Sequence, residues 1–329
     1  MKSKVINMKK LSIVIPTLNR ANLLIDTINA FKGQINRNSE LVELIVCNNA
    51  SEDNTIEQLN SINSIPFFSI IDYKDRVDIG NSIYRSLLNA TGEYVILWGD
   101  DDMPCPYFLD IVLSYLSKYP NIGLLHYNRL RGIDEDGTFK SLSVLRDEYY
   151  QLEEKFEDTD IFLQRFFTDT TFISSIIFRK EDWEKYQSME TSNHYGYEFY
   201  APIFCGVKDK DILYINYPLC IQRIANFKKR FWSSNAALCR LLGIPNLLKC
   251  LGDNGVIKKP NKIWNAEPNT FFSYTVALLQ AAGYKKKYKP LLKEICAHQP
   301  NLGRKLWAYF IVYCIASKTY MYLKQAYSN

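Results

Sequence analysis

Three consecutive carboxylates, Asp100, Asp101 and Asp102, have the clearest capacity for chemistry in this chain. They follow the apolar run Tyr94–Trp98, which is typical of a buried strand. Adjacent carboxylates repel one another unless a cation or a hydrogen-bond network neutralises them. As hard oxygen ligands they suit Mg²⁺ or Mn²⁺, and such a cation could neutralise charge on a leaving nucleotide. A solvent-exposed acidic turn that caps the next helix would show the same residues, but the prolines that follow favour a fixed loop.

Two more polar clusters follow earlier apolar runs. Each run is short and is followed by a helical spacing of apolar residues, as in alternating strands and helices. The clusters are Pro16, Thr17, Asn19 and Arg20 after Leu11–Ile15, and Asn48, Asn49, Ser51 and Asp53 after Leu41–Cys47. The alternation predicts an α/β fold with a doubly wound, mostly parallel sheet flanked by helices. Ligands of such sheets bind beyond the carboxyl ends of the strands, where all three clusters fall.

The remaining pattern divides the chain. We expect one α/β domain over residues 1–232, with a nucleotide-binding half at about 9–130 and an acceptor half at 131–232, and a helical region over residues 233–329. In the acceptor half, Asp134–Gly137 predicts a hairpin turn and Gly196–Cys205 a helix. Further strands are expected at Ser174–Phe178, Ile212–Ile215 and Leu219–Arg223.

Composition excludes several protein classes. The 329 residues are 47% hydrophobic and 23% charged, an ordinary globular balance. The 8 Cys are scattered with no Cys-x-x-Cys pair, which argues against a zinc site and favours thiols in a reducing cytosol. No apolar run is long enough to cross a bilayer, and Leu11–Ile15 is too short for a signal peptide. We therefore expect a cytoplasmic protein.

Charge is concentrated toward the C-terminus. From Lys258 onward there are 12 basic and 2 acidic residues, a net +10, so the preceding part carries −5 of the total +5. The aromatic and basic segment Leu302–Tyr322 could lie at the inner face of a bacterial plasma membrane as a peripheral contact. Packing within the protein, or a dimer contact, would give the same pattern. No nucleic-acid-binding motif accompanies the basic residues, so no nucleic-acid partner is expected.

Three familiar catalytic motifs are missing. No Gly-x-Gly-x-x-Gly follows the first strand, there is no Walker motif, and there is no Gly-x-Ser-x-Gly elbow. Instead, three segments resemble family 2 glycosyltransferases in the same order. Ser12–Arg20 resembles their first strand and loop, Cys47–Thr55 their second loop, and Ala90–Asp102 their metal-binding segment. The pairing of Asn-Ala-Ser with Gly-Asp-Asp-Asp is similar to abequosyltransferase-like enzymes of bacterial O-antigen synthesis.

This resemblance implies a GT-A fold and inverting transfer from a nucleoside diphosphate sugar to a glycan or lipid-linked saccharide. By analogy the two earlier clusters bind the donor, and Asn48 and Asn49 stand where the family usually has Asp against the base. An amide carries both a donor and an acceptor, so uracil, thymine and cytosine all stay open. Asp101 is the implied metal ligand, supported by Asp102, while Asp100 contacts ribose or diphosphate. Arg223 and Lys229 would contact the diphosphate from a later loop.

Inverting transfer also requires a carboxylate that accepts the proton of the acceptor hydroxyl. The stretch matching the family's catalytic base contains Glu198, although Phe199 replaces the usual second acid. A surface helix residue would also fit this position, and Asp182 is a weaker alternative. Two other functions stay open: a nucleotidyltransferase-like enzyme, against which the Gly-free loop Pro16–Arg20 argues, and a non-catalytic nucleotide-sugar-binding module, against which the intact acid cluster argues.

Overall fold

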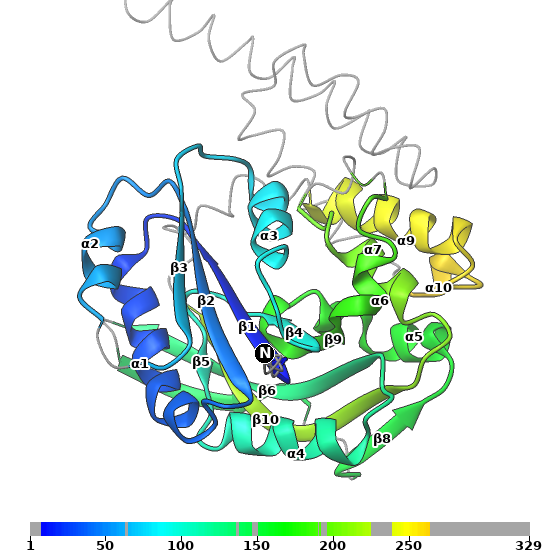
Figure 1. Ribbon diagram of the computed structural model, residues 1–329. Helices are drawn as coiled ribbons and strands as arrows, with labels where there is room; N and C mark the ends of the chain where they lie inside the picture. Colours follow the sequence, from blue (N-terminus) through cyan, green and yellow to red (C-terminus); the bar gives the residue numbers. More distant parts are fainter. Residues whose placement is uncertain are drawn as a thin grey trace, which may run out of the picture.

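The computed structural model describes residues 8–62, 65–135, 138–146, 151–189, 191, 196–224 and 239–263. Within them a single sheet forms the centre of the molecule (Figure 1). The sheet order is β3 (Phe68–Tyr73), β2 (Val42–Asn49), β1 (Leu11–Thr17), β4 (Tyr94–Leu97), β9 (Ile176–Arg179), β6 (Leu124–Glu135), β10 (Ile212–Ile224) and β5 (Met103–Pro104). In addition, β7 (Thr138–Val144) pairs with β6, and β8 (Glu153–Phe156) pairs with β10.

The sheet is parallel where the three polar clusters lie. Strands β3, β2, β1 and β4 are hydrogen-bonded in parallel. β9 is antiparallel to both β4 and β6, so β6 and its parallel neighbour β10 run in the same direction as β1. The predicted doubly wound, mostly parallel sheet is confirmed.

Helices cover both faces of the sheet. One apolar cluster joins the sheet to α1 (Ala21–Arg37), α2 (Thr55–Asn60) and α4 (Phe108–Lys118). The other joins it to α3 (Ile79–Leu87), α5 (Thr159–Thr170), α6 (Lys180–Glu184), α7 (Tyr200–Gly206), α9 (Ile244–Asp253) and α10 (Pro260–Ile263). Two short helices, η1 (Ile173–Ser175) and η4 (Cys239–Gly243), complete the set of described helices.

Burial on both faces explains the continuous apolar runs of the inner strands. In β1, Leu11, Ile13 and Ile15 face α1, whereas Val14 faces the opposite layer, and all four are fully buried. Successive side chains of a strand point to opposite faces, so a strand covered by helices on both sides is mostly apolar, and the one polar residue in this run, Ser12, is hydrogen-bonded to Glu43 and the Gly92 N–H. The first strand was therefore easy to predict.

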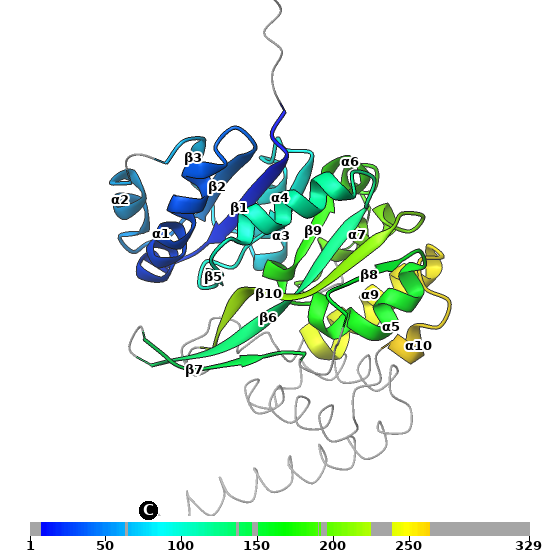
Figure 2. The ribbon, with the colours of Figure 1, turned by 90° about the horizontal axis from the view of Figure 1, so that it is seen from below.

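The acceptor half departs from the prediction in two places. The two strands expected at 212–215 and 219–223 are one strand, β10, whose pairing with β6 shifts register between Ile215 and Cys220. The helix expected at 196–205 begins only at Tyr200, so Glu198 lies in the preceding loop. The predicted hairpin at 134–137 is confirmed, because β6 and β7 pair with Glu135 opposite Thr138, and this hairpin reaches outward from the sheet in Figure 2.

Residues 264–329 lie outside the described residues, and with them most of the predicted helical region and the segment Leu302–Tyr322. No helix among the described residues is both long and apolar enough to pass through a bilayer. The division into domains at residue 232 stays a prediction.

Candidate donor and metal site

The acid cluster is held by the loop that follows β1. The Thr17 hydroxyl donates to one carboxylate oxygen of Asp100 at 2.8 Å, and a guanidinium nitrogen of Arg20 lies 2.7 Å from the other. The same nitrogen lies 3.1 Å from Asp101 Oδ2. Two predicted strand-end clusters therefore meet, and Arg20 supplies the positive charge that adjacent carboxylates require.

Burial and neighbouring charges shift the pKa values of Asp100 and Arg20 in opposite directions. Burial raises the pKa of Asp100, and Asp101 adds to that shift, while Arg20 and the Thr17 hydroxyl oppose it. Burial alone would lower the pKa of Arg20, but the three carboxylates outweigh it and the net shift is upward. The guanidinium thus stays charged at any physiological pH, and the site presents a fixed cation next to buried acids.

Asp102 faces into the protein. The Ser174 hydroxyl donates to its Oδ2 at 2.7 Å, and the backbone N–H of Arg223 donates to its Oδ1 at 3.2 Å. Its carboxylate also packs on Gly99, where an added Cβ would lie 2.5 Å from Asp102 Oδ2. Asp102 therefore ties the end of β4 to η1 and β10.

Of the two carboxylates that pair with Arg20, that of Asp101 is the more exposed. Its side chain is 16% exposed, against 9% for that of Asp100, and its backbone oxygen accepts from Arg223 Nε at 2.9 Å. Among the described residues no three His, Cys, Asp or Glu side chains are arranged as a closed metal cage. A magnesium-type ion needs only one or two carboxylates when a diphosphate supplies other oxygens. Asp101 and Asp102 would provide two such carboxylates, and the direction of the Asp102 carboxylate is fixed by Ser174 and the Arg223 N–H.

The second cluster fixes the loop beside Asn19. The Ser51 hydroxyl accepts from the Asn19 backbone N–H at 2.9 Å, and the Asn19 side-chain oxygen accepts from the Glu52 N–H at 2.7 Å. Asn19 has a φ of 54°, in the left-handed region that Asn tolerates better than most residues. Asp53 accepts from the first backbone N–H of α1, on Ala21, at 3.3 Å. The ends of β1 and β2 are thus bonded into one surface.

Glu198 lies against the start of α3. Both of its carboxylate oxygens accept from the Gly196 N–H, at 2.9 and 2.8 Å. A Cβ on Gly80 would lie 2.0 Å from Glu198 Oε2, so only glycine allows this approach. Burial raises the pKa of Glu198, the Gly196 N–H opposes the shift, and Asp78, which caps α3, adds to it. This is a carboxylate with the elevated basicity expected of a general base.

Comparison with known proteins decides the family. The sequence profile of glycosyl transferase family 2 matches residues 12–200. The chain belongs to glycosyl transferase family 2. A relative, abequosyltransferase RfbV of Salmonella typhimurium, is 26% identical over 231 residues, which are 67% of this chain and 69% of that protein. An uncharacterised glycosyltransferase of Rickettsia conorii is 30% identical over 38% of this chain, but that match spans only 20% of the relative.

Solved structures confirm the GT-A fold of this family 2 glycosyltransferase. Staphylococcus aureus TarS 1-349 in complex with UDP-GlcNAc superposes with a TM-score of 0.59 at 11% identity, over 90% of each chain. The mannosyltransferase PcManGT of Pyrobaculum calidifontis, in complex with GDP-Man and Mn²⁺, gives a TM-score of 0.53 at 15% identity, over 94% of this chain and 86% of that one. Family membership favours sugar transfer over the nucleotidyltransferase and binding-module alternatives.

Four other predicted residues of the glycosyltransferase remain to be placed. Arg223 lies at the acid cluster, buried between Asp102 and Asp101. Asp182 is 1% exposed and forms an ion pair with Lys185 at 2.8 Å, which indicates a structural role in α6. Lys229 lies outside the described residues. Pro16 is part of β1 and pairs with Cys47, directly before the Thr17 that holds Asp100.

Sequence reasoning missed four supporting residues. Thr27 of α1 donates to the backbone oxygens of Asp100 and Asp102, at 3.2 and 3.0 Å. Ser174, Gly80 and Asp72 also contact predicted site residues. Only Gly80 left a signal, since a glycine in the first turn of a helix costs stability and so calls for a packing reason.

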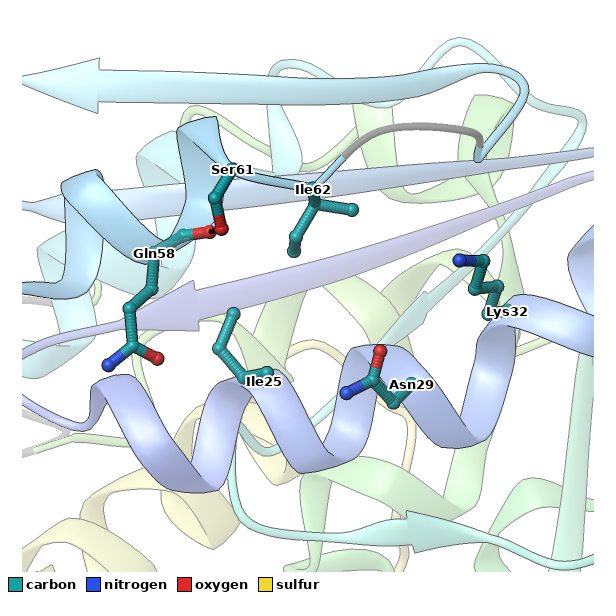
Figure 3. A pocket seen from close by; sticks show the side chains of 6 residues that line it. All are labelled: Ile25, Asn29, Lys32, Gln58, Ser61 and Ile62. Atoms are coloured by element: carbon teal, nitrogen blue, oxygen red, sulfur yellow. Dashed lines mark hydrogen bonds between the residues drawn. The ribbon is translucent and has the colours of Figure 1, made fainter.

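A separate hollow on the surface lies away from this site. It is lined by Ile25, Asn29 and Lys32 of α1 and by Gln58, Ser61 and Ile62 of the α2 segment, with a volume of about 520 Å³ (Figure 3). It contains none of the predicted site residues, and Lys32 is its sole charged lining residue. This hollow is therefore separate from the predicted donor residues at the strand ends.

Proposed function

We propose that this glycosyltransferase transfers a sugar, with inversion, from a nucleoside diphosphate sugar to a glycan or lipid-linked saccharide in bacterial surface polysaccharide (O-antigen or capsule) synthesis. The main support for the donor site is the contact between the acid cluster and the loop after β1, in which Thr17 and Arg20 both donate hydrogen bonds to Asp100. Similarity to an abequosyltransferase supports the polysaccharide role. Solved relatives hold UDP-GlcNAc or GDP-Man, which supports a nucleoside diphosphate sugar as donor.

In this proposal the donor diphosphate lies over Asp101 and Arg20. Asp101 and Asp102 would hold Mn²⁺ or Mg²⁺, which supplies positive charge to the leaving nucleoside diphosphate. Arg20, which pairs with Asp100 and Asp101, would bind the phosphate oxygens of the donor, because guanidinium groups bind phosphate well. Arg223 fixes the backbone of Asp101 and so the direction of its carboxylate.

The transfer itself requires one proton to move. The acceptor hydroxyl oxygen attacks the anomeric carbon, and the bond from that carbon to the phosphate oxygen breaks, so the nucleoside diphosphate leaves with the electron pair. Glu198 takes the hydroxyl proton. Burial favours this role because it raises the pKa of Glu198 and so makes the carboxylate a stronger base.

A peripheral contact with the membrane is also part of the proposal. Its support is the net +10 charge from Lys258 onward, which would be attracted to anionic lipid. Flotation of the intact chain with anionic vesicles tests it, and recovery of all protein in the unbound fraction would count against it.

The first test is binding of the donor. Titration calorimetry with UDP, dTDP, GDP and CDP, with and without Mn²⁺, should show metal-dependent binding of at least one nucleotide. Asp101→Ala should lose that dependence, because it removes the more exposed carboxylate of the cluster. Asp253→Ala is the matched control. It removes an aspartate that forms an exposed ion pair with Lys249 and that is not part of the acid cluster. Binding of no nucleotide by folded protein would refute the proposed function.

A further inference from the structure

One row of side chains runs across the strand ends from the acid cluster to the edge of the sheet. Thr17 of β1 is opposite Asn48 of β2, and Asn48 is opposite Asp72 of β3. Paired residues of parallel strands project from the same face of the sheet, and neighbouring strands lie about 4.8 Å apart. Asp72 is therefore about 10 Å from Thr17, the residue that holds Asp100.

The two asparagines of β2 have their amide groups engaged within the protein. Asn48 Nδ2 donates to Asp72 Oδ1 at 2.9 Å, Asn48 Oδ1 accepts from the Ser51 N–H at 3.2 Å, and the residue is 1% exposed. Asn49 points to the other face of the sheet. It donates to the Val77 carbonyl at 2.9 Å and accepts from the Val77 N–H at 3.1 Å and from Arg85. Both amides therefore build the loops around the site.

Asp72 is the exposed end of the row. Its side chain is 33% exposed, and hydrogen bonds from Lys74 and Asn48 lower its pKa. The carboxylate is thus charged at neutral pH and can only accept hydrogen bonds. Asn48 restrains one of its oxygens, while Lys74 binds the other from a side chain that is 83% exposed.

We propose that Asp72 selects the base of the donor nucleotide and that Asn48 is its positioning residue. The inference rests on the proposed function, which places the diphosphate at Asp101. A nucleotide that extends from there along the row brings its base to β3. An acceptor-only carboxylate attracts the ring N–H of uracil, thymine or guanine. It repels the ring nitrogen of cytosine or adenine, which carries a lone pair at the corresponding place.

This assignment accounts for the absence of a carboxylate at the end of β2. The acidic group lies one strand further toward the edge of the sheet, and the asparagine that stands on β2 holds it in place. The donor is then a sugar linked to a uridine, thymidine or guanosine diphosphate.

Calorimetry with Mn²⁺ and five nucleotides tests this assignment. The wild-type protein should bind at least one of UDP, dTDP and GDP about 10- to 100-fold more tightly than CDP and ADP, which is the loss expected when a hydrogen bond to a charged group is replaced by repulsion. In Asp72→Asn the preference should fall to within about threefold, because an amide can donate to a ring nitrogen as well as accept. Asn48→Ala should reduce the preference without abolishing metal-dependent binding.

Asp75→Asn is the control, because it alters an exposed neighbouring carboxylate that is not in the row. Tighter binding of CDP or ADP by the wild type, or an unchanged preference in Asp72→Asn, would overturn the assignment while metal-dependent binding kept the proposed function intact. An effect of Asn48→Ala on thermal stability alone would show that Asn48 is merely structural. Failure of the folded wild-type protein to bind any of the five nucleotides would overturn the donor site itself.

Discussion

At the scale of single residues, the carboxylates of this enzyme differ in environment more than in type. Asp102 accepts hydrogen bonds from Ser174 and the Arg223 backbone and is 4% exposed. Glu198, in contrast, accepts only backbone N–H bonds among its recorded contacts, and its pKa is raised by burial. The hydrogen bonds give the Asp102 carboxylate a fixed direction, which suits a metal ligand, whereas a carboxylate with raised basicity is suited to proton transfer.

Replacing Glu198 should separate chemistry from binding. We expect Glu198→Gln to lower kcat by at least 100-fold, since general base catalysis contributes about 10²- to 10⁴-fold, while donor affinity measured by calorimetry stays within about threefold. In the wild type, kcat should fall as pH drops through the pKa of Glu198, because only the ionised carboxylate accepts a proton. This fall in kcat at low pH is the acid limb of the profile. Since burial raises the pKa of Glu198, the midpoint of the acid limb should lie above the ordinary glutamate pKa of 4.5.

The same pH profile provides the control. In Glu198→Gln any residual turnover should lack the acid limb, because the titrating group has been removed. Asp182→Asn should keep the limb, since Asp182 is buried and paired with Lys185. If Glu198→Gln turned over at a rate near that of the wild type, another residue would have to be the base.

At the scale of elements, the first turn of α3 and the loop before α7 depend on one another. Gly80 is the second residue of α3, and the Glu198 carboxylate occupies the space that a Cβ would need. Gly196, with a φ of 102°, bends the loop so that its N–H reaches the same carboxylate. The catalytic proposal therefore depends on two glycines as well as on one acid.

Gly80→Ala should displace Glu198 without unfolding the helix. Alanine is more favourable than glycine in a helix by about 1 kcal/mol, and the atoms that it would meet belong to the end of a long side chain. We expect kcat to fall about 10-fold or more, with the melting temperature equal to or above that of the wild type. Gly33→Ala in α1 is the control, because the nearest atom to its added Cβ lies at 3.9 Å. Unchanged kcat in Gly80→Ala would show that the position of Glu198 is not critical.

The sequence predicted elements well where one local pattern determines them. The apolar runs of β1 and β4 are buried on both faces, and the polar residues at their ends, Thr17 and Asp100, do meet. Prediction was poorer where distant residues decide the outcome. Glu198, in the loop before α7, packs against Gly80, and the pairing of Asn48 with Asp72 depends on strand register. The contact between Asn48 and Asp72 has no local signal in the sequence, and Gly80 indicates a packing constraint without identifying Glu198 as the partner.

At the scale of the whole molecule, elements that are distant in the sequence share one apolar core. The apolar cluster on the α3 side includes Val14 of β1 and Ile45 of β2 together with Phe166 of α5 and Leu247 of α9. A continuous core of this kind favours cooperative unfolding of the described residues, so a change deep in this core should alter the stability of the whole. His126 of β6 lies in this core.

His126 should make the free energy of unfolding depend on pH. Burial lowers the pKa of His126 to about 4, an effect that Arg129 and Arg146 reinforce and that Asp169 and the Ser175 carbonyl oppose. In the unfolded chain the pKa is about 6.5, so between pH 6.5 and 4 only the unfolded state takes up the proton. Stability is therefore complete above pH 6.5 and falls as the pH drops, by about 3 kcal/mol at pH 4.

Urea unfolding of the wild type and of His126→Gln at pH 7 and pH 4.5 measures this contribution. Glutamine can keep a hydrogen bond to the Ser175 carbonyl, which lies 2.9 Å from Nδ1 of His126, but it does not titrate. The variant will be less stable at pH 7, because it loses ring contacts with Phe162, Phe166 and Tyr214. Its loss of stability between the two pH values should be smaller than that of the wild type by about 2–3 kcal/mol. Equal losses would mean that the buried ring accepts a proton without unfolding the core.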